Sequence, residues 1–421
     1  MAKKKKAVKL PRELTRHQLA GWQRQKKRQR IIFIAGVCVI TAVLVIIGVG
    51  WYAGLYRPQH QTAIMVNDTK FNMKYYVDML KLRGEGQSPE FIQLLTDDIV
   101  RSIEQNELIR QEALKLGISA SNDEIKERLK KFELPVNNVT RDLAGSQILL
   151  EKLQDDYFNS QVPVSAEQAH IMAMLLESES QASDVRTRLE SGEDFAELAG
   201  ELSMNLPTKT SEGDLGWHPE SILTDLLGSP VSAEYAFGAE AGALSQPLYD
   251  EEITKGVGYW LVKVLSREEQ DAAQVQAILL GSEEKVQEVQ ARLAASDNFT
   301  ALAMEFSQLT GADRNGGELS VTAGRMTTAF DEFVYNLDIE LETLSEPIRD
   351  EEVATKGGYW LVKVLDKEDN KQIEESDRDS LKAKALDEWV SSLWDNPAND
   401  IDDSFLTAER KDWAISQVSG G

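Results

Sequence analysis

The 421-residue chain is too long for one ordinary domain, and its 42% hydrophobic content is enough to fill several cores. The single cysteine, Cys38, excludes an intrachain disulfide, and the four scattered histidines lack the spacing of a helical zinc site, so no metal and no other cofactor is expected. The net charge of −24 argues against a nucleic-acid partner because it would repel phosphate.

The N-terminal region has the opposite charge from the rest of the chain. Residues 1–30 contain twelve Lys/Arg and one acid, whereas the remainder carries a net charge of −35. Residues 31–53 carry no charge and are long enough to cross about 30 Å of hydrocarbon. The positive-inside rule then predicts a basic cytoplasmic tail at 1–30, a single transmembrane helix at 31–53 and an extracytoplasmic remainder. A cleaved signal peptide is the alternative, although this apolar run is longer than the usual signal core.

Residues 61–160 are predicted to form a helical domain. Apolar residues recur there at spacings of three and four, which is typical of one helical face: Phe91, Leu94, Leu95, Ile99, Ile103, Leu108 and Ile109. Gly117 suits a helix end, and Ser121 with Glu124 forms a capping box that predicts a new helix start.

An internal repeat is the most informative feature of the chain. GEDFAELAGELS at 192–203 corresponds to SDNFTALAMEFS at 296–307, and GVGYWLVKVL at 256–265 corresponds to KGGYWLVKVL at 356–365. The repeats therefore cover residues 165–267 and 272–367, and a period of about 100 residues indicates tandem domains and not a solenoid.

Each repeat predicts the same order of elements. A short apolar strand is followed by helices, a glycine-rich turn, a further helix and two closing strands, with Pro247 or Pro347 near the last hairpin. This order favours an α+β fold in which helices surround a small antiparallel sheet.

The C-terminal segment, residues 370–421, is again predicted to be helical, because Leu381, Ala385, Trp389 and Leu393 are spaced by four. A segment this short cannot bury its apolar face alone. We expect it to pack on the 61–160 helices and to complete that domain.

The repeat resembles the parvulin peptidyl-prolyl isomerase family through G-E-D-F-A-E-L-A, E-G-D-L-G-W, S-Q-P and G-Y-W-L-V-K-V in the first copy. The second copy carries N-F-T-A-L-A, G-G-E-L, S-E-P and the same G-Y-W-L-V-K-V. The wider layout of apolar segment, helical region, two repeats and helical tail resembles PrsA-type foldases and SurA-type chaperones. That resemblance implies a membrane-anchored, extracytoplasmic foldase that isomerises X-Pro bonds in unfolded, proline-containing exported polypeptides.

The resemblance also implies site residues in the first repeat. His170 is placed at the family's first histidine and Asn205 at its Cys/Asp position, so these two are the predicted catalytic residues. Phe237 fits an aromatic position of the substrate pocket, and Trp260 replaces a second histidine. A structural role is the competing interpretation for His170 and, more strongly, for Trp260.

In the second repeat Met326, Phe330 and Tyr335 fit the apolar substrate pocket. Ala277 and Trp360 stand where histidines are expected, and Leu309 aligns with the Cys/Asp position. The second repeat is therefore expected to be inactive, and Met326 and Phe330 are alternatively core residues.

Two functions other than catalysis remain open. Because the histidines are incomplete, the chain could instead be a non-catalytic holdase in which both repeats and the helical domain form a cradle for unfolded segments. The repeats could also be interaction surfaces of a scaffold in an envelope assembly.

Overall fold

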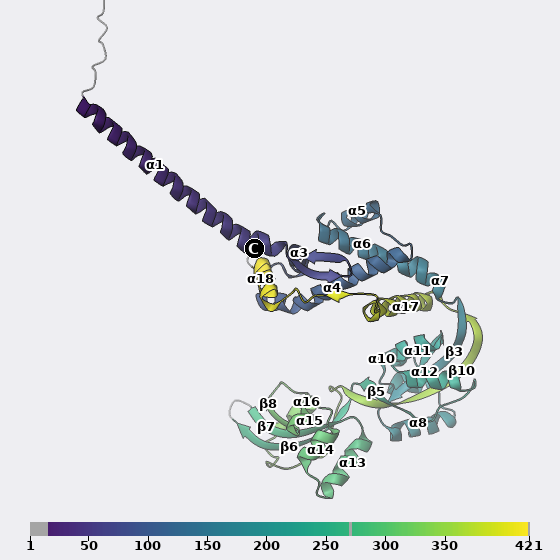
Figure 1. The fold of residues 1–421 in the computed structure, drawn as a ribbon. Helices are drawn as coiled ribbons and strands as arrows, with labels where there is room; N and C mark the ends of the chain where they lie inside the picture. The colour runs from purple at the N-terminus through teal and green to yellow at the C-terminus, as the bar shows by residue number, and fades with distance from the viewer. Residues whose placement is uncertain (1–15, 269–271, 420–421) are drawn as a thin grey trace, which may run out of the picture. The chain divides into compact units, whose positions relative to one another are not determined.

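A computed structural model describes residues 16–268 and 272–419, which form helices and small antiparallel sheets (Figure 1). The expected α+β fold is confirmed. The described residues divide into two compact units, one ending at Tyr157 and resuming at Leu386, the other covering Phe158–Ala385. The first half of the predicted cytoplasmic tail, residues 1–15, lies outside the described residues.

The N-terminal apolar segment is one long helix. Helix α1 (Arg16–Trp51) continues into the π-helical turn η1 (Tyr52–Tyr56) and α2 (Arg57–Gln59). Within it, Gly36–Gln59 is long and apolar enough to span a bilayer, with a mean hydropathy of 2.2. Its apolar side chains are exposed, for example Ile46 at 70%. A helix that meets this criterion of length and composition is compatible with a membrane anchor or with an N-terminal signal segment.

In the first unit a short hairpin is followed by four helices. Strands β1 (Thr62–Val66) and β2 (Thr69–Asn72) pair antiparallel and are followed by α3 (Met73–Gly84), α4 (Pro89–Lys115), α5 (Asn122–Lys131) and α6 (Asn138–Lys152). The predicted capping box is present at the start of α5. The expected apolar face of α4 is buried from Ile99 onward, but Leu94 is 77% exposed, and Ile92 is buried in its place.

The chain returns to this unit from Leu386 onward. The part of α17 (Glu375–Asp395) beyond Ala385 belongs to it, and β11 (Ile401–Asp402) pairs antiparallel with β1. Helix α18 (Ala408–Ser419) packs on α3 and α4 and buries Ala414 and Val418. The hydrophobic core of the unit therefore depends on residues separated by more than 300 positions in the chain.

The second unit contains two bodies, each with a four-stranded antiparallel sheet. After η2 (Leu153–Phe158) and α7 (Asn159–Gln161), the elements from the first repeat are β3 (Ser165–Leu176), α8 (Glu179–Glu190), α9 (Phe195–Leu202), α10 (Leu206–Thr210), β4 (Asp214–His218), α11 (Glu220–Leu227), α12 (Pro230–Gly238), β5 (Leu248–Lys255) and β6 (Gly258–Glu268). The second repeat supplies β7 (Ala272–Leu280), α13 (Glu283–Ala294), α14 (Phe299–Phe306), α15 (Ala312–Asn315), β8 (Glu318–Thr322), α16 (Thr328–Val334), β9 (Ile348–Asp350) and β10 (Thr355–Gln372).

The two repeats exchange their last strands. The sheet of the first body has the order β4-β3-β10-β5, and the sheet of the second body has the order β8-β7-β6-β9. In the first body Trp360 of β10 pairs with Leu175 of β3, whereas Trp260 of β6 pairs with Leu279 of β7 in the second. The ranges 165–267 and 272–367 therefore describe the sequence repeats but not the two folded bodies. Since the octapeptide GYWLVKVL is identical at 258–265 and 358–365, either copy offers the same side chains to either sheet.

Polar contacts hold the chain where the exchanged strands cross. Lys255 is 2% exposed, and its ammonium group donates to the carbonyl of Gly357. Burial lowers the pKa of Lys255 to about 8. Glu177, at the end of β3, accepts hydrogen bonds from the Tyr259 hydroxyl and, at 2.8 Å, from Nη2 of Arg349 in the second body. These contacts tie the two bodies together within the unit.

Candidate functional site

Backbone hydrogen bonds establish which positions of the two bodies are equivalent. In both bodies a glycine carbonyl accepts from an alanine N–H at 2.9 Å, and a serine hydroxyl accepts from a leucine N–H at 3.1 Å. The residues in the first body are Ala173, Gly213, Leu175 and Ser203, and those in the second are Ala277, Gly317, Leu279 and Ser307. Ala173, and not His170, is therefore the structural counterpart of Ala277.

His170 lies three residues before that position, on the opposite face of β3 from Ala173. Its Nε2 is 2.7 Å from Oδ1 of Asp214, and its ring lies 5.7 Å from that of Trp217. Although partial burial disfavours the charged Asp214 carboxylate, the hydrogen bonds from His170 and the Gly216 amide lower its pKa. His170 thus joins β3 to the neighbouring strand β4.

Asn205 caps a short helix at the other end of β3. Its side-chain oxygen accepts from the amide of Thr208 at 3.1 Å, at the start of α10. The chain beside it is attached to β3 by the hydrogen bond from the Met204 amide to the Leu175 carbonyl at 2.8 Å. Leu175 lies five residues, or about 16 Å of strand, from His170. The structure therefore does not bring the two predicted catalytic residues together.

The last strand, β10, brings Trp360 into the core of the first body. This tryptophan is fully buried with Ala173 and Leu223, and its indole N–H donates to Asp250 at 3.1 Å. Phe237 packs, partly buried, against this cluster, and the ammonium group of Lys367 lies 5.8 Å from its ring centre. Asn205, Phe237 and Trp360 therefore belong to one body, whereas Trp260 does not.

In the second body Trp260 lies with the predicted pocket residues of the second repeat. Its indole N–H donates to Asp350 at 2.8 Å, and its ring meets that of Phe330 edge-on at 4.9 Å. Met326 and Tyr335 are partly buried against the same cluster, while Phe330 is fully buried. The apolar set of the second repeat is therefore brought together, with Trp260 from the first repeat added to it.

The equivalence of Ala173 and Ala277 could have been found from the sequence, although the motif alignment placed His170 there instead. The motif serines Ser203 and Ser307, and the glycines Gly213 and Gly317, are separated by the same 104 positions, and this offset relates Ala173 to Ala277. The octapeptide instead repeats after 100 positions, so insertions separate the two halves of the motif. The strand exchange had no such signal.

No group of three or more His, Cys, Asp or Glu side chains within the described ranges is placed to hold a metal ion. The residues gathered in both bodies are apolar and aromatic side chains with a few hydrogen-bonding groups. Such a set can surround a proline ring and orient a peptide, and it provides no nucleophile.

Two comparisons of sequence identify what the repeats resemble. Models described as PPIC-type PPIase domain match residues 170–266 and 259–368. Among curated proteins, the foldase protein PrsA of Caldanaerobacter subterraneus subsp. tengcongensis is 27% identical over 190 residues, which cover 42% of this chain and 59% of PrsA. The chaperone SurA of Alcanivorax borkumensis is 28% identical over 266 residues, covering 59% of this chain and 57% of SurA. The chain thus matches a little under three fifths of the length of these two relatives.

Among solved structures, PrsA from Bacillus anthracis aligns with 82% of this chain and 93% of its own, at 13% identity and a TM-score of 0.26. The sequence matches cover both repeats in chain order, although each match includes a strand that completes the other body. The chain therefore contains two PPIC-type peptidyl-prolyl isomerase domains and is related in sequence to the PrsA foldases and SurA chaperones.

Proposed function

We propose that this protein is a membrane-anchored extracytoplasmic foldase that binds unfolded exported polypeptides and catalyses cis–trans isomerisation of their X-Pro bonds. The observation that carries the proposal is the pair of PPIC-type domain matches at 170–266 and 259–368. The apolar N-terminal helix and the basic residues before it support an anchor with the bulk of the chain outside the cell.

The reaction requires shape more than reactive groups. Rotation about an X-Pro bond meets a barrier of about 18–20 kcal/mol set by amide resonance, and no bond is broken. A pocket that surrounds the proline ring with apolar side chains and binds the twisted amide better than the planar forms lowers that barrier. In the first body Phe237 is the candidate to contact the proline ring, and Asn205 is the candidate to hydrogen-bond the substrate peptide. Met326 and Tyr335 are the corresponding apolar candidates in the second body.

The test is proline-limited refolding of a model protein in the presence of the full chain in lipid nanodiscs. The foldase should raise the slow refolding rate in proportion to its concentration, because uncatalysed isomerisation takes tens to hundreds of seconds. Phe237→Ala should reduce the gain if the first body is active, while Met326→Ala tests the second body in the same way. A wild-type chain that leaves the slow phase unchanged would remove the catalytic part of the proposal.

A non-catalytic holdase is a second candidate, favoured by one specific observation. The equivalent positions Ala173 and Ala277 both lack an ionisable side chain, and Trp360 is fully buried in the first body. A holdase would suppress aggregation of an unfolded protein in stoichiometric amounts without accelerating its proline-limited refolding. Measuring aggregation and refolding rate on the same preparation separates the two functions.

A further inference from the structure

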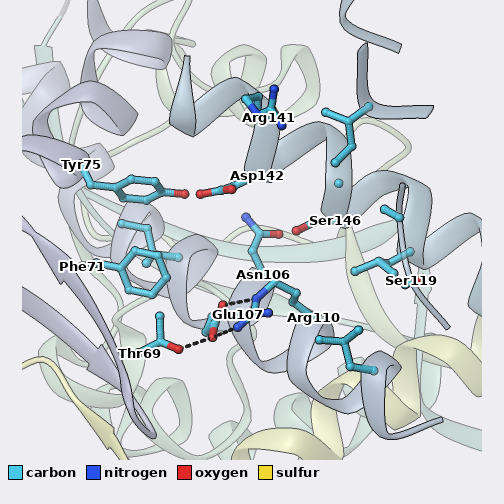
Figure 2. Close-up of a pocket in the computed structure, with 16 residues that line it drawn as sticks. Thr69, Phe71, Tyr75, Asn106, Glu107, Arg110, Ser119, Arg141, Asp142 and Ser146 are labelled. Carbon is cyan, nitrogen blue, oxygen red and sulfur yellow. Dashed lines mark hydrogen bonds and ion pairs between the residues drawn. The ribbon is translucent and has the colours of Figure 1, made fainter. Parts of the chain in front are cut away.

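A pocket of about 390 Å³ lies in the helical unit and is lined by residues of that unit alone. Its walls come from β2 and from helices α3 to α6 (Figure 2). Apolar side chains form much of the lining, among them Phe71, Ile103, Ile125 and Leu149. This volume is at the lower end of the range for small-ligand sites and is sufficient for one large side chain with its peptide group.

The buried acid at one side of this pocket already has its hydrogen bonds. Glu107 is 5% exposed and accepts from Thr69 at 2.6 Å, from Gln111 at 2.6 Å and from Arg110 through two nitrogens at 2.6 and 2.7 Å. Burial opposes the charged carboxylate, but these hydrogen bonds outweigh it and lower the pKa of Glu107. Glu107 is therefore a structural anchor between β2 and α4.

The formal charges of the lining cancel. Two acids, Glu107 and Asp142, face two bases, Arg110 and Arg141. The hydroxyl of Tyr75 and the carboxylate of Asp142 point toward each other across the pocket (Figure 2). Burial raises the pKa of Asp142. The lining therefore presents no net formal charge to a ligand, and because a charge that enters a partly buried site is costly, a neutral ligand is favoured.

Two neutral polar side chains face the pocket without a side-chain hydrogen bond to another described residue. The amide of Asn106 lies between Asp142 and Ser146 in Figure 2, and neither Asn106 nor the Ser146 hydroxyl has a side-chain hydrogen bond to any described residue. A side-chain amide carries an acceptor and a two-hydrogen donor side by side. That arrangement matches the N–H and C=O of an extended polypeptide.

We propose that this pocket binds a neutral segment of a client polypeptide, holding one apolar side chain between Phe71 and Leu149 while Asn106 hydrogen-bonds the peptide group beside it. The inference rests on the proposed foldase function, because that function supplies unfolded polypeptides as ligands. It adds a binding site outside the isomerase domains, where a client can stay bound while its prolines isomerise.

The test uses the full chain in lipid nanodiscs and measures binding of fluorescently labelled, reduced and carboxymethylated lysozyme by anisotropy. Asn106→Leu keeps the side-chain size but removes the amide, and Gly145→Leu fills the pocket. A Cβ on Gly145 would meet Ile125 at an ordinary 3.5 Å. We expect each substitution to weaken binding at least fivefold. Gln105→Leu, on the same helix but outside the pocket lining, is the matched control and should change binding less than twofold.

Binding by Asn106→Leu that equals or exceeds that of the wild type would overturn the proposal, as would an equal loss in Gln105→Leu. Thermal unfolding checks that each variant folds, and Gly145→Leu carries the test if Asn106→Leu does not. Isomerisation of a proline tetrapeptide should be unchanged in both variants. If the wild-type chain binds the probe through Asn106 but isomerises nothing, the catalytic function fails while the pocket assignment stands.

Discussion

In the two isomerase bodies, an alanine on a central strand and a buried tryptophan occupy positions where the family motif predicts histidines. The counterparts Ala173 and Ala277 leave space on the central strand, and a tryptophan from the last strand packs on the same sheet face in each body. Both indole N–H groups are satisfied by aspartates, Asp250 and Asp350. Burying a large aromatic with its polar atom paired stabilises a small core strongly. The substitution of apolar groups at the expected histidine positions is therefore accommodated in both bodies by the same packing.

Asn205 permits a test that separates capping from catalysis. Asn205→Ala should cost about 1 kcal/mol of unfolding free energy, because it removes the acceptor for the Thr208 amide at the start of α10. Asn205→Asp keeps that acceptor and should remain within about 0.5 kcal/mol of the wild type. Urea denaturation followed by far-UV circular dichroism measures both. Equal destabilisation by the two variants would contradict the capping role. If Asn205→Asp keeps the stability of the wild type but lowers the gain in the refolding rate of a client protein, the amide acts on substrate.

Because Lys255 is buried at the strand crossing, the unfolding free energy is expected to change with pH in the alkaline range. The pKa of Lys255 is about 8 in the folded protein against an ordinary 10.5, so between these values the unfolded chain binds more protons than the folded one. The unfolding free energy should then rise as pH increases from 8 to 10.5, by at most about 3 kcal/mol. The opposing influences are the facing acids Glu177 and Glu284, which favour the charged lysine.

Lys255→Met should abolish this rise, because it removes the titrating group while keeping an unbranched side chain. Lys356→Met is the matched control, since Lys356 lies at the same crossing but its side chain is 60% exposed. Denaturant unfolding at a series of pH values between about 7 and 11 measures the slopes. A wild-type slope that survives in Lys255→Met would show that another group is responsible.

At the scale of elements, the exchange of β6 and β10 is the main departure from the sequence-based domain ranges. A strand is recruited by its alternation of side chains, and two identical strands cannot be assigned to their sheets by that pattern. The chain segments approach each other closely at the crossing, since a Cβ on Gly258 would lie 2.6 Å from Cγ2 of Thr355. Close approach of the two chain segments thus requires glycine at this point.

Engineered disulfides can distinguish the exchanged from the unexchanged arrangement. Lys363 is the cross-strand partner of Met172, so Met172→Cys with Lys363→Cys, in a Cys38→Ser background, should oxidise within one chain. The matched pair is Met172→Cys with Lys263→Cys, which uses the identical octapeptide position and should stay reduced.

Non-reducing electrophoresis and peptide mapping read the result. A disulfide in the pair that uses position 263 would contradict the exchange within one chain. In the pair that uses position 363, a disulfide that joins two separate molecules would show that strands are traded between chains instead.

For the molecule as a whole, the two compact units depend on different distant segments. The helical unit is closed by residues near the C-terminus, whereas the isomerase unit is closed internally by β10. Contacts of such long sequence separation are costly in loop entropy, and each must be compensated by burial of a substantial apolar surface.

Removal of residues 396–421 should therefore destabilise the helical unit selectively. The deletion takes away β11 and α18, which exposes the edge of β1 and the apolar faces of α3 and α4. Hydrogen exchange measured by mass spectrometry should become faster in β1 and α3, while β3 and β7 stay protected. Val418→Asp places a charge at a side chain that is 4% exposed and should act in the same direction without deletion. Unchanged protection in α3 would contradict this dependence.

The sequence by itself determined the features that are written in local patterns. These are the apolar span, the capping box of α5, the helical face from Ile99 onward, the repeat and its relation to the isomerase family. Only the tertiary structure decided which copy of GYWLVKVL completes which body, that Ala173 and not His170 corresponds to Ala277, and that Asn106 faces a pocket with Asp142. The physical reason is that periodicity and capping depend on neighbours a few residues apart. Strand pairing and pocket formation instead depend on contacts between distant segments, for which two identical local sequences are equivalent until the whole chain has folded.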